Sequence, residues 1–86
     1  MGNALVVVKV YPEGPDEVAQ VEAGVKALKS GAVKETRREP IAFGLELIKA
    51  GIVIPDKTDG IMEKLEEEIK AIPGVKDLEV EGVTLL

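Results

Sequence analysis

The sequence predicts an α+β fold in which one four-stranded antiparallel sheet carries two helices on one face. Residues 15–30 and 61–71 have apolar side chains at helical spacing, and four strand-like segments surround them. The resulting order is strand, helix, strand, strand, helix, strand, and residues 31–35 resemble residues 74–77. This split βαβ pair is typical of the ferredoxin-like βαββαβ sandwich.

The first half of the chain divides into a strand, a helix and a second strand. Residues 4–11 form a β-branched, almost continuously apolar run, which predicts a central strand with Val6, Val8 and Val10 facing the core. A breaker cluster at residues 12–15 follows, and Pro15 or Asp16 starts a helix that ends at residues 30–31. Its expected buried residues are Val18, Val21, Val25 and Leu28. Residues 32–37 alternate weakly, as an edge strand does.

The second half repeats the pattern. Residues 45–54 predict the third strand, with Ile48, Ala50, Ile52 and Ile54 on the core face. Residues 55–60 form a loop in which Thr58 or Asp59 caps the second helix; a weak cation site at Asp56 and Asp59 is the less favoured reading of the same loop. The helix carries Met62, Leu65, Ile69 and Ile72, and residues 75–81 form the fourth strand with Leu78 and Val80 inward.

Length and composition limit the function classes. The chain has 86 residues, which allows one domain, 1–86, with a core that needs no metal or disulfide. Cysteine and histidine are absent, so the thiol nucleophile, the commonest metal ligand and the usual general acid/base are missing. We therefore expect no catalytic residue, no metal and no cofactor. Without a signal peptide or a bilayer-length apolar run, a cytoplasmic protein is expected.

The charge balance opposes nucleic-acid binding. Sixteen acidic residues against eleven basic ones give a net charge of -5, whereas phosphate contacts require positive surface. The only aromatic residues are Tyr11 and Phe43, too few for a base-stacking platform. The turn at residues 12–15 lacks the lysine and threonine spacing of a phosphate-binding loop. The remaining reading is a protein surface that acts on another protein.

The connection between the second and third strands is unusually apolar. Pro40 biases Glu39 toward an extended conformation and Gly44 permits a turn, so Ile41, Ala42 and Phe43 form an apolar triplet on a surface loop. Polar residues are the ordinary choice there. Two readings stand: Phe43 is an exposed contact residue, or it folds back as a lid on the core.

Residues 39–45, leading into the apolar strand at residues 47–54, resemble the central hairpin of translation elongation factor 1 beta of the archaeal type. That family is the guanine nucleotide exchange factor for the translational GTPase elongation factor 1 alpha, and the resemblance covers the whole chain. It implies that the protein promotes GDP release and GTP loading on elongation factor 1 alpha during translation elongation, and that it is not an enzyme with bond-making chemistry of its own.

The resemblance also implies a partner-binding site. Phe43 matches the family phenylalanine and presses into the GTPase, while Pro40, Ile41, Ala42 and Gly44 shape the tip. Arg37 and Arg38 stand where they can pair with partner carboxylates; a cross-strand ion pair on the sheet surface is the competing reading.

The end of the chain departs from the eukaryotic pattern. Eukaryotic members have a lysine next to the last residue, associated with disturbing the magnesium and phosphate region, whereas this chain has Leu85. Three explanations remain open: the lysine role is dispensable, another cation such as Lys34 or Lys49 serves, or exchange works by mechanical displacement from the Phe43 tip.

The fold alone permits other functions. The alternative is a small ferredoxin-like ligand-sensing or protein-interaction module that dimerises through its sheet, although Lys9 and Lys49 on the outer sheet face disfavour it. An acylphosphatase-like hydrolase would need an anion-binding loop after the first strand, and the sequence has none.

Overall fold

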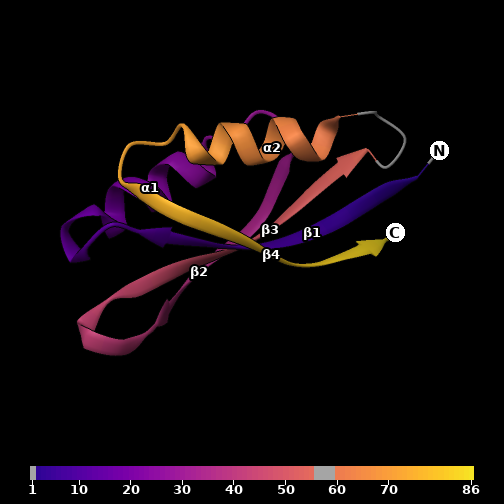
Figure 1. Cartoon of the computed structure of the whole chain (residues 1–86). Helices are drawn as coiled ribbons and strands as arrows, with labels where there is room; N and C mark the ends of the chain where they lie inside the picture. The colour runs from indigo at the N-terminus through magenta and orange to yellow at the C-terminus, as the bar shows by residue number, and fades with distance from the viewer. Residues whose placement is uncertain (1, 56–59) are drawn as a thin grey trace.

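The structure is a ferredoxin-like sandwich, as the order of the predicted elements indicated. The computed structural model describes residues 2–55 and 60–86. The strands are β1 (Asn3–Pro12), β2 (Ala32–Pro40), β3 (Glu46–Pro55) and β4 (Val75–Leu85); the helices are α1 (Val18–Lys26) and α2 (Ile61–Lys70). The strand order is β2-β3-β1-β4, every pairing is antiparallel, and both helices lie on one face of the sheet (Figure 1).

The two central strands are the most apolar ones. β1 pairs with β3 on one side and with β4 on the other, and β2 pairs only with β3. A central strand loses water from both edges, so the valine-rich β1 and the isoleucine-rich β3 occupy these positions. β2 carries charged side chains along most of its length, which suits a strand whose outer edge has no partner strand.

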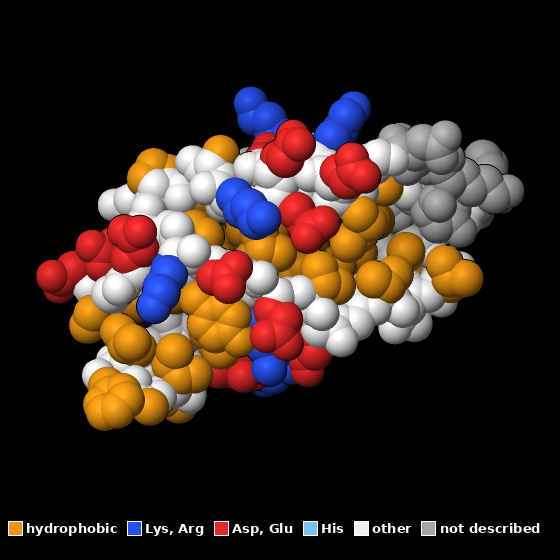
Figure 2. Space-filling view, viewed as in Figure 1, with side chains coloured by type: hydrophobic (Ala, Val, Ile, Leu, Met, Phe, Trp, Pro, Cys, Tyr) orange, Lys and Arg blue, Asp and Glu red, His pale blue; other side chains and the backbone are white. Residues whose placement is uncertain are grey.

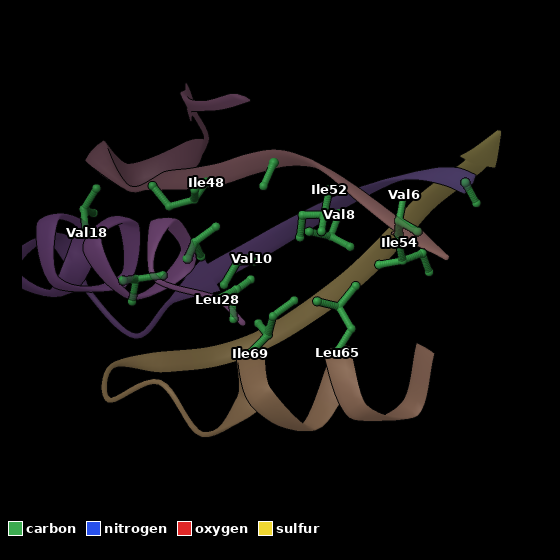
Figure 3. Packing of buried hydrophobic residues seen from close by; sticks show 14 residues of the cluster. Val6, Val8, Val10, Val18, Leu28, Ile48, Ile52, Ile54, Leu65 and Ile69 are labelled. Atoms are coloured by element: carbon green, nitrogen blue, oxygen red, sulfur yellow. The ribbon is translucent and has the colours of Figure 1, made fainter. Parts of the chain in front are cut away.

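One hydrophobic cluster joins the sheet to both helices. Figure 3 shows Leu65 and Ile69 projecting from α2 toward the strands, where they meet side chains of β1 and β3. Every strand and helix residue predicted for the core of β1, α1 and β3 is buried: Val6, Val8, Val10, Val18, Val21, Val25, Leu28, Ile48, Ala50, Ile52 and Ile54. Met62, Ile72, Leu78 and Val80 are partly buried and pack against the cluster. The alternation and helical spacing therefore identified the core correctly.

The first helix is shorter than its apolar pattern predicts. A 3-10 turn, Pro15–Glu17, precedes α1, which ends at Lys26 instead of at residues 30–31. The backbone N–H groups of Lys29 and Ser30 donate to the Glu68 carboxylate of α2 at 2.8–3.1 Å. The Glu68 side chain thus accepts hydrogen bonds from backbone amides that, in a longer α1, would donate to carbonyl groups of the helix itself.

The two helices approach closely where α1 has a glycine. A Cβ built on Gly24 would lie 2.4 Å from Cγ2 of Ile72, just after α2, so a larger residue would displace that side chain. α2 begins at Ile61, as predicted, and its N-cap residue is Gly60. The predicted capping residues Thr58 and Asp59, and the weak cation reading of Asp56 and Asp59, lie outside the described residues.

The face of the sheet away from the helices is only partly polar. β3 presents Lys49 and Gly51 there, and β1 presents Leu5, Val7 and Lys9. Leu47 is on the same side of β3 as Lys49 but is only 4% exposed. The prediction that the buried residues of β3 are those on the side of Ile48 was therefore incomplete. β4 also extends further than predicted, to Leu85 instead of Glu81.

Candidate partner-binding site

The hairpin between β2 and β3 is the most distinctive surface feature. Its strands pair as far as Pro40 and Glu46, and residues 41–45 form the connection. Two hydrogen bonds close it: the Ile41 N–H donates to the Leu45 carbonyl at 2.8 Å, and the Leu45 N–H donates to the Ala42 carbonyl at 3.3 Å. The hairpin end lies opposite the two chain ends along the length of the molecule (Figure 1).

Phe43 points into solvent at the tip of this hairpin. Its exposed fraction is 96%, so it contributes nothing to the hydrophobic core. The lid reading of Phe43 is therefore wrong. A fully exposed phenylalanine leaves its apolar surface in water, and burying it against a partner would recover about 1.5 to 3 kcal/mol.

The backbone at Phe43 is also in an unusual conformation. Its φ of 64° and ψ of 31° are left-handed, and it is the only non-glycine residue with positive φ in residues 2–55 and 60–86. For an L-residue with a side chain this conformation costs about 1 to 2 kcal/mol. Gly44 follows with φ of 74°, so two successive left-handed residues turn the chain. Strain of this kind is concentrated at functional sites, where the surrounding structure maintains it.

The residues on either side of Phe43 at the tip are exposed and mostly apolar. Pro40, Ala42 and Gly44 are exposed, and Ile41 is 37% exposed. Hydrophobic side chains gather at the lower left of Figure 2, over the end of this hairpin. The four tip residues named from the sequence beside Phe43 are thus all exposed, as Phe43 itself is.

The two arginines point to opposite faces of the sheet. Arg38 lies opposite Ile48, on the helix face, and its Nη2 is 3.0 Å from Glu22 Oε1 of α1. The hydrogen bond and the charge of Arg38 lower the pKa of Glu22, and the same contact raises the pKa of Arg38. For Arg38, the structure thus shows a strand-to-helix pair instead of the cross-strand pair that was the competing reading. Arg37 lies opposite Lys49, is exposed, and has no ion pair within the described residues.

A charged cluster connects three strands on the outer face. Lys49 Nζ lies 3.1 Å from Glu81 Oε2 and 3.8 Å from Glu39 Oε1. Val7 pairs with Gly82 and Val8 pairs with Val80, so Glu81 is the extra residue of a bulge in β4. This bulge allows the Glu81 side chain to reach Lys49. Lys34 occupies a similar shift in β2 and is exposed. No local sequence signal indicates either bulge.

Residues 2–55 and 60–86 show neither a metal-binding cluster nor a membrane-spanning helix. They contain no group of three or more acidic side chains placed to hold a metal ion. Within the same residues, no helix is both long and apolar enough to cross a bilayer.

The ferredoxin-like sandwich and the exposed Phe43 define this molecule as a small α+β protein with an apolar hairpin tip. The chain belongs to the family of the EF-1 guanine nucleotide exchange domain, which matches residues 5–86. This confirms the family resemblance seen in the hairpin sequence.

Curated proteins similar to this chain include archaeal proteins named elongation factor 1-beta. The one from Ignicoccus hospitalis is 40% identical over 86 residues, covering 96% of this chain and 92% of the relative. The one from Desulfurococcus amylolyticus is 41% identical over 91 residues, covering 100% and 99%. Among solved structures, the ACT domain from GTP pyrophosphokinase of Chlorobium tepidum has a TM-score of 0.63 at 11% identity, covering 91% of this chain and 97% of that one. This last similarity supports the fold alone.

Proposed function

We propose that residues 1–86 act as one guanine nucleotide exchange domain, in the cytoplasm, on the GTPase elongation factor 1 alpha. The protein promotes GDP release and GTP loading during translation elongation and makes no covalent bond itself. The observation that carries this proposal is the conformation of Phe43: an apolar ring 96% exposed, on a left-handed residue at the end of a closed hairpin. Family membership supplies the partner.

In the proposed complex, Phe43 enters an apolar pocket of the GTPase. Pro40, Ile41, Ala42 and Gly44 form the surface around the ring and exclude water from it, as residues around an interface hot spot do. Arg37 contributes from the outer face of β2. Arg38 is engaged with Glu22, so its role is to hold the hairpin against α1, and a direct contact with the partner would require that pair to open.

A single ring is insufficient for fast exchange. Burial of Phe43 contributes about 1.5 to 3 kcal/mol, whereas a thousandfold acceleration requires about 4 kcal/mol. Moreover, a ligand shifts an equilibrium only by its differential affinity for the two states. Other contacts must therefore also favour the GTPase conformation in which the nucleotide is loosely held.

Of the residues that could supply a cation to the magnesium site, Lys49 and Leu85 are poorly suited, whereas Lys34 is exposed. Lys49 is paired with Glu39 and Glu81, so its charge is already compensated. Leu85 is 73% exposed on β4 and carries no charge. Mechanical displacement by Phe43 needs neither residue to supply a cation.

The test is release of labelled GDP from elongation factor 1 alpha with substoichiometric amounts of this protein. We expect acceleration by the wild type, and a loss of about 30-fold or more with Phe43→Ala, equivalent to about 2 kcal/mol or more. The melting temperature should stay within about 2 °C, because the ring makes no core contact.

Val83→Ala is the matched control, since it also truncates an exposed apolar side chain but lies on β4, away from the tip. It should leave exchange unchanged. A wild-type protein that does not accelerate GDP release contradicts the proposed function. Equal exchange by the wild type and Phe43→Ala contradicts the role of the tip.

A further inference from the structure

A groove of about 490 Å³ lies on the outer face of the sheet, opposite the helices. Its floor is formed by β1 and β3, its rim by β2 and Lys49, and one end by Leu86. We call it the outer groove and define it by Leu5, Val7, Gly51 and Val53 on the floor, Lys34, Glu35, Arg37 and Lys49 on the rim, and Leu86 at the end. Its volume is in the range of clefts that accept a ligand group or several side chains.

The floor is hollow because β3 has a glycine at its centre. Gly51 pairs with Val7 in β1 and with Glu35 in β2. A Cβ at Gly51 would find only ordinary contacts, 3.5 Å from Leu5 Cδ1 and 3.8 Å from Glu35 Cγ, and its φ is not positive. The backbone therefore does not require glycine here. What the glycine provides is space between the apolar side chains of Leu5, Val7 and Val53.

Two cations on the rim of the outer groove, Lys34 and Arg37, lie outside the Lys49 cluster, in a protein that carries a net charge of -5. Lys49 and one acid, Glu35, also line the groove. Lys49 is compensated by carboxylates outside the groove. Lys34 and Arg37 are exposed and have no ion pair within the described part of the chain.

We propose that the outer groove binds a segment of the GTPase partner that presents an apolar side chain next to a carboxylate. The apolar side chain enters the space above Gly51, and the carboxylate pairs with Lys34 and Arg37. This inference rests on the proposed function, but it assigns a second contact with a different task. The tip drives nucleotide release, whereas the outer groove supplies affinity.

Charge complementarity selects this occupant over a second copy of the protein. In a two-fold dimer the same patch meets itself, which would bring Lys34 and Arg37 of two chains toward each other. Two molecules of net charge -5 also repel. An acidic, apolar segment of another protein would instead bring a carboxylate toward Lys34 and Arg37.

The first test reverses the charge of the rim. The double variant Lys34→Glu, Arg37→Glu is compared with Lys64→Glu, Lys70→Glu, whose exposed lysines lie on α2 in the opposite layer. Both variants change the net charge equally, so the comparison cancels long-range electrostatics. We expect the rim variant to raise the dissociation constant for GDP-bound elongation factor 1 alpha by about tenfold or more relative to the control.

The second test fills the groove without altering charge. Gly51→Val suits a strand and should weaken binding about tenfold, while circular dichroism and the melting temperature verify that the variant is folded. Binding is measured by titration calorimetry, separately from nucleotide exchange. A failure of the outer groove proposal can therefore be distinguished from a failure of the proposed exchange function. If the wild type releases GDP but both groove variants bind like the control, the outer groove proposal is overturned. If the groove variants weaken binding but the wild type releases no GDP, only the exchange function fails.

A wild type that does not bind elongation factor 1 alpha contradicts both proposals. A rim variant that lowers the maximal rate while binding normally would also contradict the separation of tasks, because it would place Lys34 or Arg37 in the release step.

Discussion

At the scale of single residues, the backbone conformation of Phe43 is as unusual as the exposure of its ring. A left-handed φ of 64° directs the side chain away from the hairpin, and two backbone hydrogen bonds of the loop maintain it. The conformation lowers stability and has no compensating contact in the core. Such an arrangement is expected when a site needs the ring already exposed before the partner arrives.

The cost of this backbone can be measured with Phe43→Gly. Glycine adopts positive φ without strain, so the variant should be about 1 kcal/mol more stable than Phe43→Ala, which keeps a Cβ in the same conformation. Both variants should lose nucleotide exchange. Guanidinium unfolding of the two variants gives the difference in the free energy of unfolding. Equal stability of the glycine and alanine variants would contradict a left-handed residue 43.

The two adjacent arginines show the limit of reading residues from a sequence. Both were candidates for the partner site, and neighbouring strand residues necessarily point to opposite faces. The sequence does not show which residues of other elements lie beside Arg37 and Arg38 on the two faces of the sheet. Arg38 meets Glu22 on α1, whereas Arg37 reaches the outer groove. Only the packing of α1 against the sheet brings Glu22 to that place.

At the scale of elements, one carboxylate links the two helices. Glu68 of α2 accepts hydrogen bonds from the backbone N–H groups of Lys29 and Ser30, which follow α1. Hydrogen bonding by Ser30, together with these amides, lowers the pKa of Glu68 below its ordinary value. The charged form is therefore favoured in the folded state.

This link predicts a pH dependence of stability. Because the pKa of Glu68 is lower in the folded than in the unfolded protein, its contribution is present above the unfolded pKa, near 4.5, and is lost as the pH falls through the folded pKa. Glu68→Gln should cost about 1 kcal/mol at pH 7 and reduce the stability lost between neutral and acidic pH. Urea unfolding at pH 7 and at acidic pH measures both effects.

Glu63→Gln is the matched control, since Glu63 is exposed on the same helix. It should leave the pH profile unchanged. A Glu68→Gln protein with the wild-type difference between the two pH values would contradict the proposed link.

At the scale of the whole molecule, the core and the candidate contacts are spatially separate. The molecule is elongated, with principal extents of 42, 20 and 16 Å. The cluster between sheet and helices fills its interior, whereas the tip lies at one end and the outer groove lies on the helix-free face. Changes in the core should therefore alter stability without altering the chemistry of contact.

Leu65→Ala tests this separation. Leu65 is fully buried in the cluster, so the variant should lose about 2 to 5 kcal/mol of the free energy of unfolding. Leu85→Ala, at a 73% exposed position, should change it by less than about 0.5 kcal/mol. At a temperature where Leu65→Ala remains folded, its rate of GDP release per folded molecule should equal that of the wild type. A reduced rate under those conditions would show that the core and the tip are coupled.

The sequence alone determined the order of elements, the buried faces of β1, α1 and β3, and the apolar hairpin, because these depend on local periodicity and on Pro40 and Gly44. The tertiary structure decided whether Phe43 is exposed, where α1 ends, and how Gly51, Lys34 and Arg37 combine into the outer groove. These features depend on side chains from elements distant in sequence, and a local pattern carries no information about which distant residues share a face.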